Sequence, residues 1–131
     1  MAKTEHNCKD AHCALHGSLS THGRSFVGTV INSKMQRTAN VEWARTRTIH
    51  KFERTATERS RVKAHNPDCL SAKKGDLVKI QECKPLSKTK TFVITEILGQ
   101  NIAYLARERL LEEAKMPVKK EEKEEAVEAE Q

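Results

Sequence analysis

The sequence predicts an all-β domain, a small closed barrel of five short strands, on three observations. Runs of β-branched and aromatic residues recur between residues 24 and 98, and Gly, Pro, Asn and Ser turn signals separate them. Gly28 lies inside the first run, as expected where a sheet bends to close on itself. The connecting loops vary in length, and short strands joined by such loops are typical of small barrels.

Alternation of apolar and polar residues places the individual strands. Residues 26–31 are apolar on both faces, as in a strand that is buried on two sides or strongly coiled. In the second run the apolar positions alternate up to Trp43, but Arg45 and Arg47 then stand where core residues belong. We therefore expect the second and third strands to leave the core as an extended hairpin. The five strands are predicted near 24–33, 38–46, 53–65, 76–82 and 91–98.

Two terminal segments flank the predicted barrel. Residues 1–23 are rich in His, Cys, Gly and Ser, which predicts an arm that wraps the domain. A helical pattern follows Gly99, with Asn101 as a possible N-cap and Pro117 beyond the end. The charged remainder lacks aromatic residues and predicts a disordered acidic tail. The expected organisation is an arm over 1–23, a barrel over 24–98, and a helix with its tail over 99–131.

Five strands suit an OB-fold, and an SH3-like barrel is the structural alternative. Sequence periodicity does not separate the two architectures. In an OB-fold, the loop between the fourth and fifth strands borders the usual nucleic-acid face. That loop is long and basic in this chain, within the segment "ECKPLSKTKTF".

The positive charge is concentrated in the barrel. The whole chain has a net charge of +6, but residues 24–91 carry 16 basic and 6 acidic residues, a net charge of +10. Residues 107–131 carry 6 basic and 9 acidic residues, a net charge of −3. A basic domain indicates a polyanionic partner, most often nucleic acid, although a solvated basic face is the alternative. Aromatic residues are few, so contacts to phosphate and sugar are favoured over base stacking.

Several function classes find no support in the sequence. No window approaches the roughly 18 apolar residues of a membrane span, and the first ten residues lack the apolar region of a signal peptide. The four cysteines are therefore expected to stay reduced in a cytoplasmic protein. No paired carboxylates, nucleophile–base pair or phosphate loop stands out, so we expect neither an enzyme nor a protein with a small-molecule substrate or cofactor.

Three basic segments are the candidate RNA-binding surface. Lysines and hydroxyls side by side suit phosphate oxygens and ribose 2′-hydroxyls. The loop between strands four and five offers Lys84, Pro85, Ser87, Lys88, Thr89 and Lys90. The connection between strands one and two offers Lys34 and Arg37. The charged hairpin offers Arg45, Arg47, Lys51, Arg54, Arg59, Arg61 and Lys63, followed by His65 and Asn66.

The arm contains a short Cys/His motif, "CKDAHCALH", with Cys8, Cys13 and His16. Structural zinc needs four Cys or His ligands, usually at tighter and paired spacings, and His12 or His22 could be the fourth. Cys69 and Cys83 are isolated and far away in the sequence. Unliganded thiols and imidazoles are therefore the expected state of the arm.

Several segments resemble the small-subunit ribosomal protein seventeen family, whose eukaryotic members are called protein eleven. They are "GRSFVGTVINSKMQRTANVEW", "AHNPDCLSAKKGDLVKIQECKPLSKTKTFVITE" and the basic hairpin between them, and the resemblance covers residues 13–98. The N-terminal "CALHGSLSTHGR" and the cysteines at positions 69 and 83 are most similar to the archaeal type.

The resemblance implies an OB-fold that binds small-subunit (16S-type) ribosomal RNA directly, in the 5′ domain, and takes part in subunit assembly beside neighbouring ribosomal proteins. It also adds contacts at Met35, Gln36, Thr38 and Leu86. A free-standing OB-fold protein that binds tRNA or single-stranded nucleic acid is the alternative. The long basic loops and the few aromatic residues favour the ribosomal interpretation.

Overall fold

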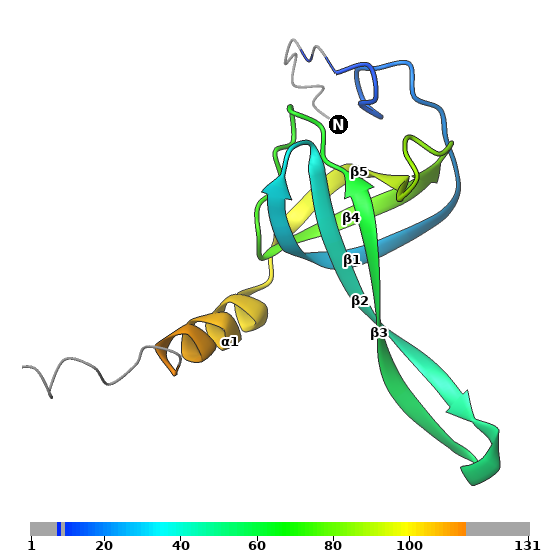
Figure 1. The fold of residues 1–131 in the computed structure, drawn as a ribbon, viewed down its shortest axis with the longest axis vertical. Helices are drawn as coiled ribbons and strands as arrows, with labels where there is room; N and C mark the ends of the chain where they lie inside the picture. The colour runs from blue at the N-terminus through cyan, green and yellow to red at the C-terminus, as the bar shows by residue number, and fades with distance from the viewer. Residues whose placement is uncertain (1–7, 9, 115–131) are drawn as a thin grey trace, which may run out of the picture. The chain divides into compact units, whose positions relative to one another are not determined.

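The computed structural model describes residue 8 and residues 10–114 of the chain, and it contains one closed five-stranded barrel (Figure 1). The strands are β1 (Thr21–Met35), β2 (Thr38–Ile49), β3 (Arg54–His65), β4 (Asp76–Cys83) and β5 (Lys90–Gln100). They follow one another around the barrel in the order β1-β2-β3-β5-β4, and β4 pairs back onto β1. β3 and β5 are parallel, and every other pair is antiparallel. This order confirms the OB-fold.

β1 closes the barrel because it pairs with two strands. Its first half pairs with β4 from Thr21 to Thr29, and its second half pairs with β2 from Thr29 to Met35. Gly28 lies where the two pairings meet. A Cβ there would lie 2.7 Å from the Glu42 carbonyl oxygen and 2.7 Å from Cγ1 of Val41, so only glycine allows β2 to approach this closely.

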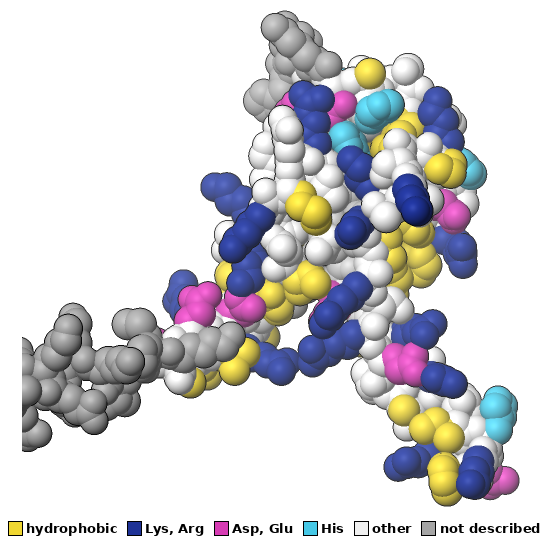
Figure 2. Space-filling model, viewed as in Figure 1, with side chains coloured by type: hydrophobic (Ala, Val, Ile, Leu, Met, Phe, Trp, Pro, Cys, Tyr) yellow, Lys and Arg dark blue, Asp and Glu magenta, His cyan; other side chains and the backbone are white. Residues whose placement is uncertain are grey.

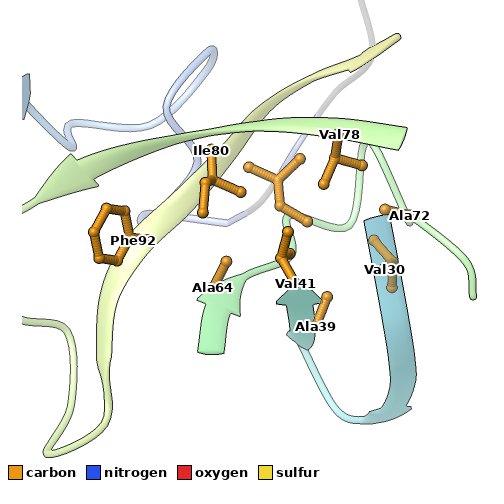
Figure 3. Close-up of a cluster of buried hydrophobic side chains, with 9 residues drawn as sticks. Val30, Ala39, Val41, Ala64, Ala72, Val78, Ile80 and Phe92 are labelled. Atoms are coloured by element: carbon orange, nitrogen blue, oxygen red, sulfur yellow. The ribbon is translucent and has the colours of Figure 1, made fainter. Parts of the chain in front are cut away.

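One hydrophobic cluster fills the barrel (Figure 3). Every strand contributes to it, and Ala72 joins from the connection between β3 and β4. Phe26 and Trp43 stack at 4.6 Å between ring centroids and close one side of the cluster. The buried members are Val30, Ala39, Val41, Ala64, Ala72, Val78, Ile80, Phe92 and Ile94.

β2 and β3 continue past this core as a twisted two-stranded ribbon (Figure 1). Their pairing is unbroken from Thr38↔His65 to Ile49↔Arg54, and a 3-10 turn over His50–Phe52 joins them. From Ala44 to Thr48 every residue of β2 is exposed. The extended hairpin is thereby confirmed. β3 begins one residue later than expected because Glu53 adopts a left-handed conformation, with φ of 47°, to end the turn.

Several strand boundaries differ from the expectation. β1 begins at Thr21, inside the predicted arm, and β2 continues to Ile49. β1 continues through most of the predicted connection, and only Gln36 and Arg37 separate it from β2, because register shifts around Asn32 keep the coiled strand paired. β5 continues past Gly99, which was expected to end it. Gly99 pairs with Leu77, and Gln100 pairs with Asp76. The side-chain amide of Asn101 donates to Oγ1 of Thr29 at 2.9 Å.

The described residues after Asn101 belong to a unit separate from the barrel. It contains the predicted helix, α1 (Ile102–Glu113), in which Tyr104 donates to Glu108 at 3.2 Å. None of the helices in the described part of the chain has the length and apolar character needed to cross a bilayer. The predicted acidic tail over 117–131 lies outside the described residues.

Candidate nucleic-acid interface

One end of the barrel brings together the β1–β2 turn, the β4–β5 loop, the end of β3 and the arm. These four segments enclose an open hollow of about 340 Å³. Its lining residues are His12, Gln36, Arg37, His65, Leu86 and Lys90. A second hollow of about 310 Å³ lies between the same turn and the β3–β4 connection, with Lys34 and Lys73 on its wall. The turn thus separates two concave surfaces, and both have cationic edges.

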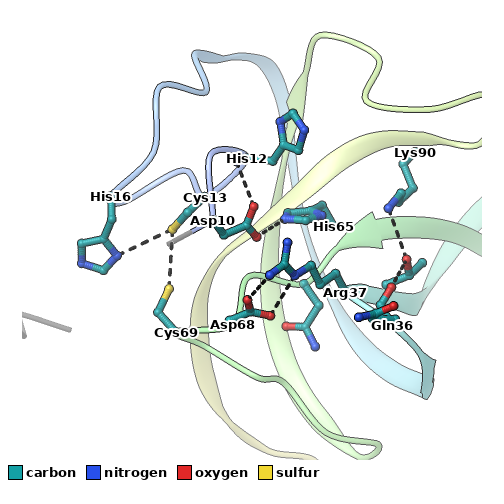
Figure 4. Close-up of polar contacts among 12 residues, drawn as sticks. Asp10, His12, Cys13, His16, Gln36, Arg37, His65, Asp68, Cys69 and Lys90 are labelled. Atoms are coloured by element: carbon teal, nitrogen blue, oxygen red, sulfur yellow. Dashed lines mark hydrogen bonds and ion pairs between the residues drawn. The ribbon is translucent and has the colours of Figure 1, made fainter. Parts of the chain in front are cut away.

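Arg37 is held in place at the tip of the β1–β2 turn. Its φ of 50° is left-handed, and its carbonyl accepts a hydrogen bond from the backbone N–H of Asn66 at 3.1 Å. Its guanidinium donates twice to the Asp68 carboxylate, at 2.7 Å and 3.2 Å (Figure 4). The hydrogen bond and the charge of Asp68 raise the pKa of Arg37. The guanidinium is therefore oriented before any partner arrives, and the Arg37 side chain stays 46% exposed.

The β4–β5 loop folds back on itself instead of extending freely. Oγ of Ser87 accepts hydrogen bonds from the backbone N–H groups of Lys90, at 3.1 Å, and Thr89, at 3.4 Å. Leu86 packs against a small cluster of Leu19, Cys83 and Val93. The loop is therefore fastened to the barrel at its middle, while the side chains of Lys84, Pro85, Lys88 and Thr89 are exposed.

Lys90 connects this loop to the β1–β2 turn. Its ammonium group donates to Oγ1 of Thr38 at 3.3 Å, and Thr38 in turn donates to the Gln36 carbonyl at 3.0 Å. The side chain of Thr38 is buried and serves this link, so the contact to RNA that the resemblance implied for it is not available in this structure.

His65 is buried, although the sequence predicted it on the RNA-facing surface. It is only 2% exposed, and its Nε2 lies 2.7 Å from Oδ2 of Asp10 (Figure 4). Burial raises the pKa of Asp10, but hydrogen bonds from the backbone N–H of His12 and from His65 outweigh burial and lower it. The neighbouring Asn66 is also engaged, because its amide bonds both backbone groups of Ala72 at 3.0 Å. Both side chains therefore hold neighbouring segments of the chain in place beneath the basic surface.

Opposite charges pair across the β2–β3 ribbon. Glu58 accepts hydrogen bonds from Arg45 at 2.7 Å and from Arg47 at 2.9 Å. These hydrogen bonds lower the pKa of Glu58, and the bond from Arg47 has the larger effect. Nearer the barrel, Glu42 lies 2.6 Å from Arg61 and 3.7 Å from Arg59. Each glutamate therefore aligns two arginines, and the ribbon keeps an excess of positive charge.

The ribbon tip exposes an aromatic ring between two cations. Phe52 is 61% exposed, and the charged ends of Lys51 and Arg54 lie 5.4 Å and 5.6 Å from its ring centroid. Sequence reasoning assigned roles to both cations and missed the ring. The available signal was a lone large apolar residue at the turn of an otherwise charged hairpin.

Cations without a carboxylate partner remain available on these surfaces. Among residues 8 and 10–114, the side chains of Lys34, Lys63, Lys84 and Lys88 form no ion pair and are exposed. Figure 2 shows Lys and Arg side chains spread over the barrel and along the ribbon. Such a surface can neutralise phosphates at several separate points.

The Cys/His motif of the arm has one neighbour that the sequence did not predict, Cys69. Cys69, which is far from the arm in sequence, lies 3.5 Å from Cys13 between sulfur atoms (Figure 4). His12 lies elsewhere, edge-on to His65 at 5.9 Å between ring centroids. Burial raises the pKa of Cys13, but hydrogen bonds from the backbone N–H groups of His16 and Leu15 lower it to about 7. The assumption that Cys69 is isolated was therefore wrong.

Known proteins share most of this domain. The family model described as ribosomal protein S17 matches residues 28–96, more than half of the chain. The chain belongs to the ribosomal protein S17 family. The small ribosomal subunit protein uS17 of Methanosphaera stadtmanae is 50% identical over 97 residues, which cover 74% of this chain and 92% of that protein. Its counterpart from Methanopyrus kandleri is 46% identical over 91 residues, covering 70% and 77%.

The S17 family match contains all three basic segments, from the β1–β2 turn through the ribbon to the β4–β5 loop. It confirms the family resemblance inferred from the quoted motifs, and both relatives are archaeal. Cys8, Cys13 and His16 precede the matched S17 region, whereas Cys69 lies inside it.

Proposed function

We propose that this protein is a non-catalytic structural constituent of the small ribosomal subunit that binds small-subunit ribosomal RNA directly. Its membership of the ribosomal protein S17 family supports this role. The observation that carries the proposal is the pair of hollows beside Arg37, which are lined by Lys34, Lys73 and Lys90, together with a second cationic surface on the ribbon.

The chemistry of these surfaces favours folded RNA over a short single strand. Lysine and arginine side chains contact phosphates, and the hydroxyls of Ser87 and Thr89 suit phosphate oxygens and ribose 2′-hydroxyls. Phe52 and His50 are the exposed rings among the described residues of the ribbon, and two rings are too few for stacking of successive bases to be the main source of affinity. Contact points on the barrel end and on the ribbon suit RNA helices and the junctions between them.

The finer assignment follows the family resemblance. We place the protein in the cytoplasmic ribosome, on the 5′ domain of 16S-type RNA, beside neighbouring small-subunit proteins and with a role in subunit assembly. The remaining RNA-facing residues of the barrel end are Met35, Gln36, Pro85 and Lys90, and those of the ribbon are Arg45, Arg47, Lys51, Arg54, Arg59, Arg61 and Lys63.

Binding of the full chain to a transcript of the 5′ domain tests this function. The log of the affinity should fall with the log of salt concentration with a slope of magnitude about 5 or more, because many phosphates are neutralised. A tagged chain should also sediment with the small subunit in sucrose gradients at high salt. A slope near −1 would mean that the basic face is not the contact surface. Equal affinity for tRNA and single-stranded RNA would support the free-standing OB-fold instead.

A further inference from the structure

Four metal-ligating side chains converge where the arm meets the β3–β4 connection. Cys8, Cys13 and His16 come from the arm, and Cys69 comes from the connection. One donor atom from each residue lies within 4.8 Å of all the others. The arm supplies three of these donors within nine residues, and the fourth is 56 positions away from Cys13.

The spacing between these donors fits a tetrahedron around one small ion. With a zinc–sulfur bond of about 2.3 Å, two sulfurs of a tetrahedral site lie about 3.8 Å apart. The Cys13 and Cys69 sulfurs are 3.5 Å apart, and Cys13 Sγ lies 3.7 Å from Nδ1 of His16. A disulfide requires a sulfur separation of about 2.05 Å and would use two of the four donors. Four convergent donors therefore indicate a metal.

We propose that Cys8, Cys13, His16 and Cys69 bind one Zn²⁺ ion in a closed, structural site. Three thiolates and one imidazole form a donor set that zinc uses in structural sites, and four protein ligands leave no coordination position for a substrate. The site belongs to the fold of the arm and is separate from the RNA-facing lysines.

The metal would fasten the arm to the connection that carries Asp68, the partner of Arg37. Cys69 follows Asp68 directly, so fixing Cys69 also restrains the carboxylate that orients Arg37. Ser71, with φ of 44°, and Pro67 lie in the same short connection, whose backbone turns at Pro67 through bonds from Leu70 and Ser71. Zinc thereby stabilises one wall of the hollow beside the β1–β2 turn.

Metal analysis of the full-length protein tests the site directly. Protein expressed with added zinc and passed through gel filtration with a weak chelator should retain one zinc per chain. Cys69→Ser and Cys13→Ser should each lose stoichiometric zinc. The matched control is Cys83→Ser, which changes a buried cysteine outside the cluster and should retain one zinc.

Cobalt substitution gives a readout that does not depend on the stability of these variants. The Co²⁺ form of the parent should show thiolate-to-cobalt charge transfer and the intense visible bands of a tetrahedral ion. His16→Cys keeps four ligands, so it should bind cobalt with stronger charge transfer, and His16→Ala should not. Parent protein without stoichiometric metal, zinc removed by the weak chelator, or zinc retained in Cys69→Ser would each overturn the proposal.

Discussion

Asp10 and His65 form a buried pair, with Oδ2 and Nε2 separated by 2.7 Å and side chains only 1% and 3% exposed. Asp10 lies in the arm and His65 at the end of β3, so this contact docks the arm onto the barrel. Both polar groups have lost their contact with water, and each depends on the other as a partner.

Removing Asp10 should therefore destabilise the domain. Asp10→Ala leaves the ring of His65 buried without its partner, which typically costs about 1–3 kcal/mol in the free energy of unfolding. Urea denaturation should show this loss, and limited proteolysis should cut the arm faster. Ser18→Ala, an exposed change in the same arm, is the control and should stay within about 0.5 kcal/mol of the parent. Equal stability of the two variants would contradict the docking role.

The exposed lysines of the β4–β5 loop should contribute to binding and not to stability. Changing Lys84 and Lys88 together to Ala should leave the melting temperature nearly unchanged, because neither side chain has a partner within the described residues. RNA binding should weaken, and the salt slope should become flatter by about two units. Lys79→Ala on β4, whose ammonium lies 3.7 Å from Glu96, is the control and should preserve the slope. An unchanged slope in the double variant would place the RNA elsewhere.

The middle of the same loop should show the opposite behaviour. Leu86 is half-buried against Leu19, Cys83 and Val93, so Leu86→Ala should cost about 1 kcal/mol of stability. Its affinity for RNA, measured well below the melting temperature, should fall less than that of the lysine variant.

Shortening residues 84–89 to a two-residue turn combines both effects. The barrel should still fold, because β4 and β5 remain paired from Glu82↔Phe92 to Asp76↔Gln100. Stability should fall by about the amount lost in Leu86→Ala, and RNA binding should weaken. A shortened protein that cannot fold, or one that binds RNA as tightly as the parent, would show that the loop has a different purpose.

The ion pairs of Glu58 on the ribbon should make the stability of the protein decrease at acidic pH. The hydrogen bonds from Arg47 and Arg45 lower the pKa of Glu58 below its ordinary 4.5. Because the folded pKa is the lower one, this stabilisation is complete above 4.5 and is lost as the pH falls through the folded value. Carboxyl-carbon NMR should show Glu58 titrating below 4.5, and Arg47→Gln should move it back toward 4.5. Titration at or above 4.5 in the parent would mean that the arginines do not hold this carboxylate in solution.

The sequence predicted the strands because their signals are local. Apolar alternation up to Trp43, and its failure at Arg45 and Arg47, defined both the core part of β2 and the point where the ribbon leaves it. The tight β1–β2 turn was missed because β1 stays paired with β2 across two register shifts, which apolar alternation does not reveal.

The site was harder to predict because its key contacts join distant positions. His65 looked like a surface residue beside Asn66, and only its pairing with Asp10, 55 positions away, shows it to be buried. Cys69 looked isolated for the same reason. The sequence located the lysines and arginines along the chain, but their division into paired and unpaired charges required the registers of the folded sheet.

The unbroken β2–β3 pairing has a mechanical consequence. The part of the ribbon beyond the core, Ala44–Ile49 with its partners, reaches roughly 20 Å at about 3.3 Å per residue. If the protein binds RNA as proposed, the ribbon tip and the barrel end are two contact points whose separation is set by the paired strands. RNA that engages one point meets the other at a high effective concentration only when its own segments are correctly spaced. On the proposed function, a misfolded RNA would contact a single point and dissociate quickly, so the length of the ribbon would favour the folded form.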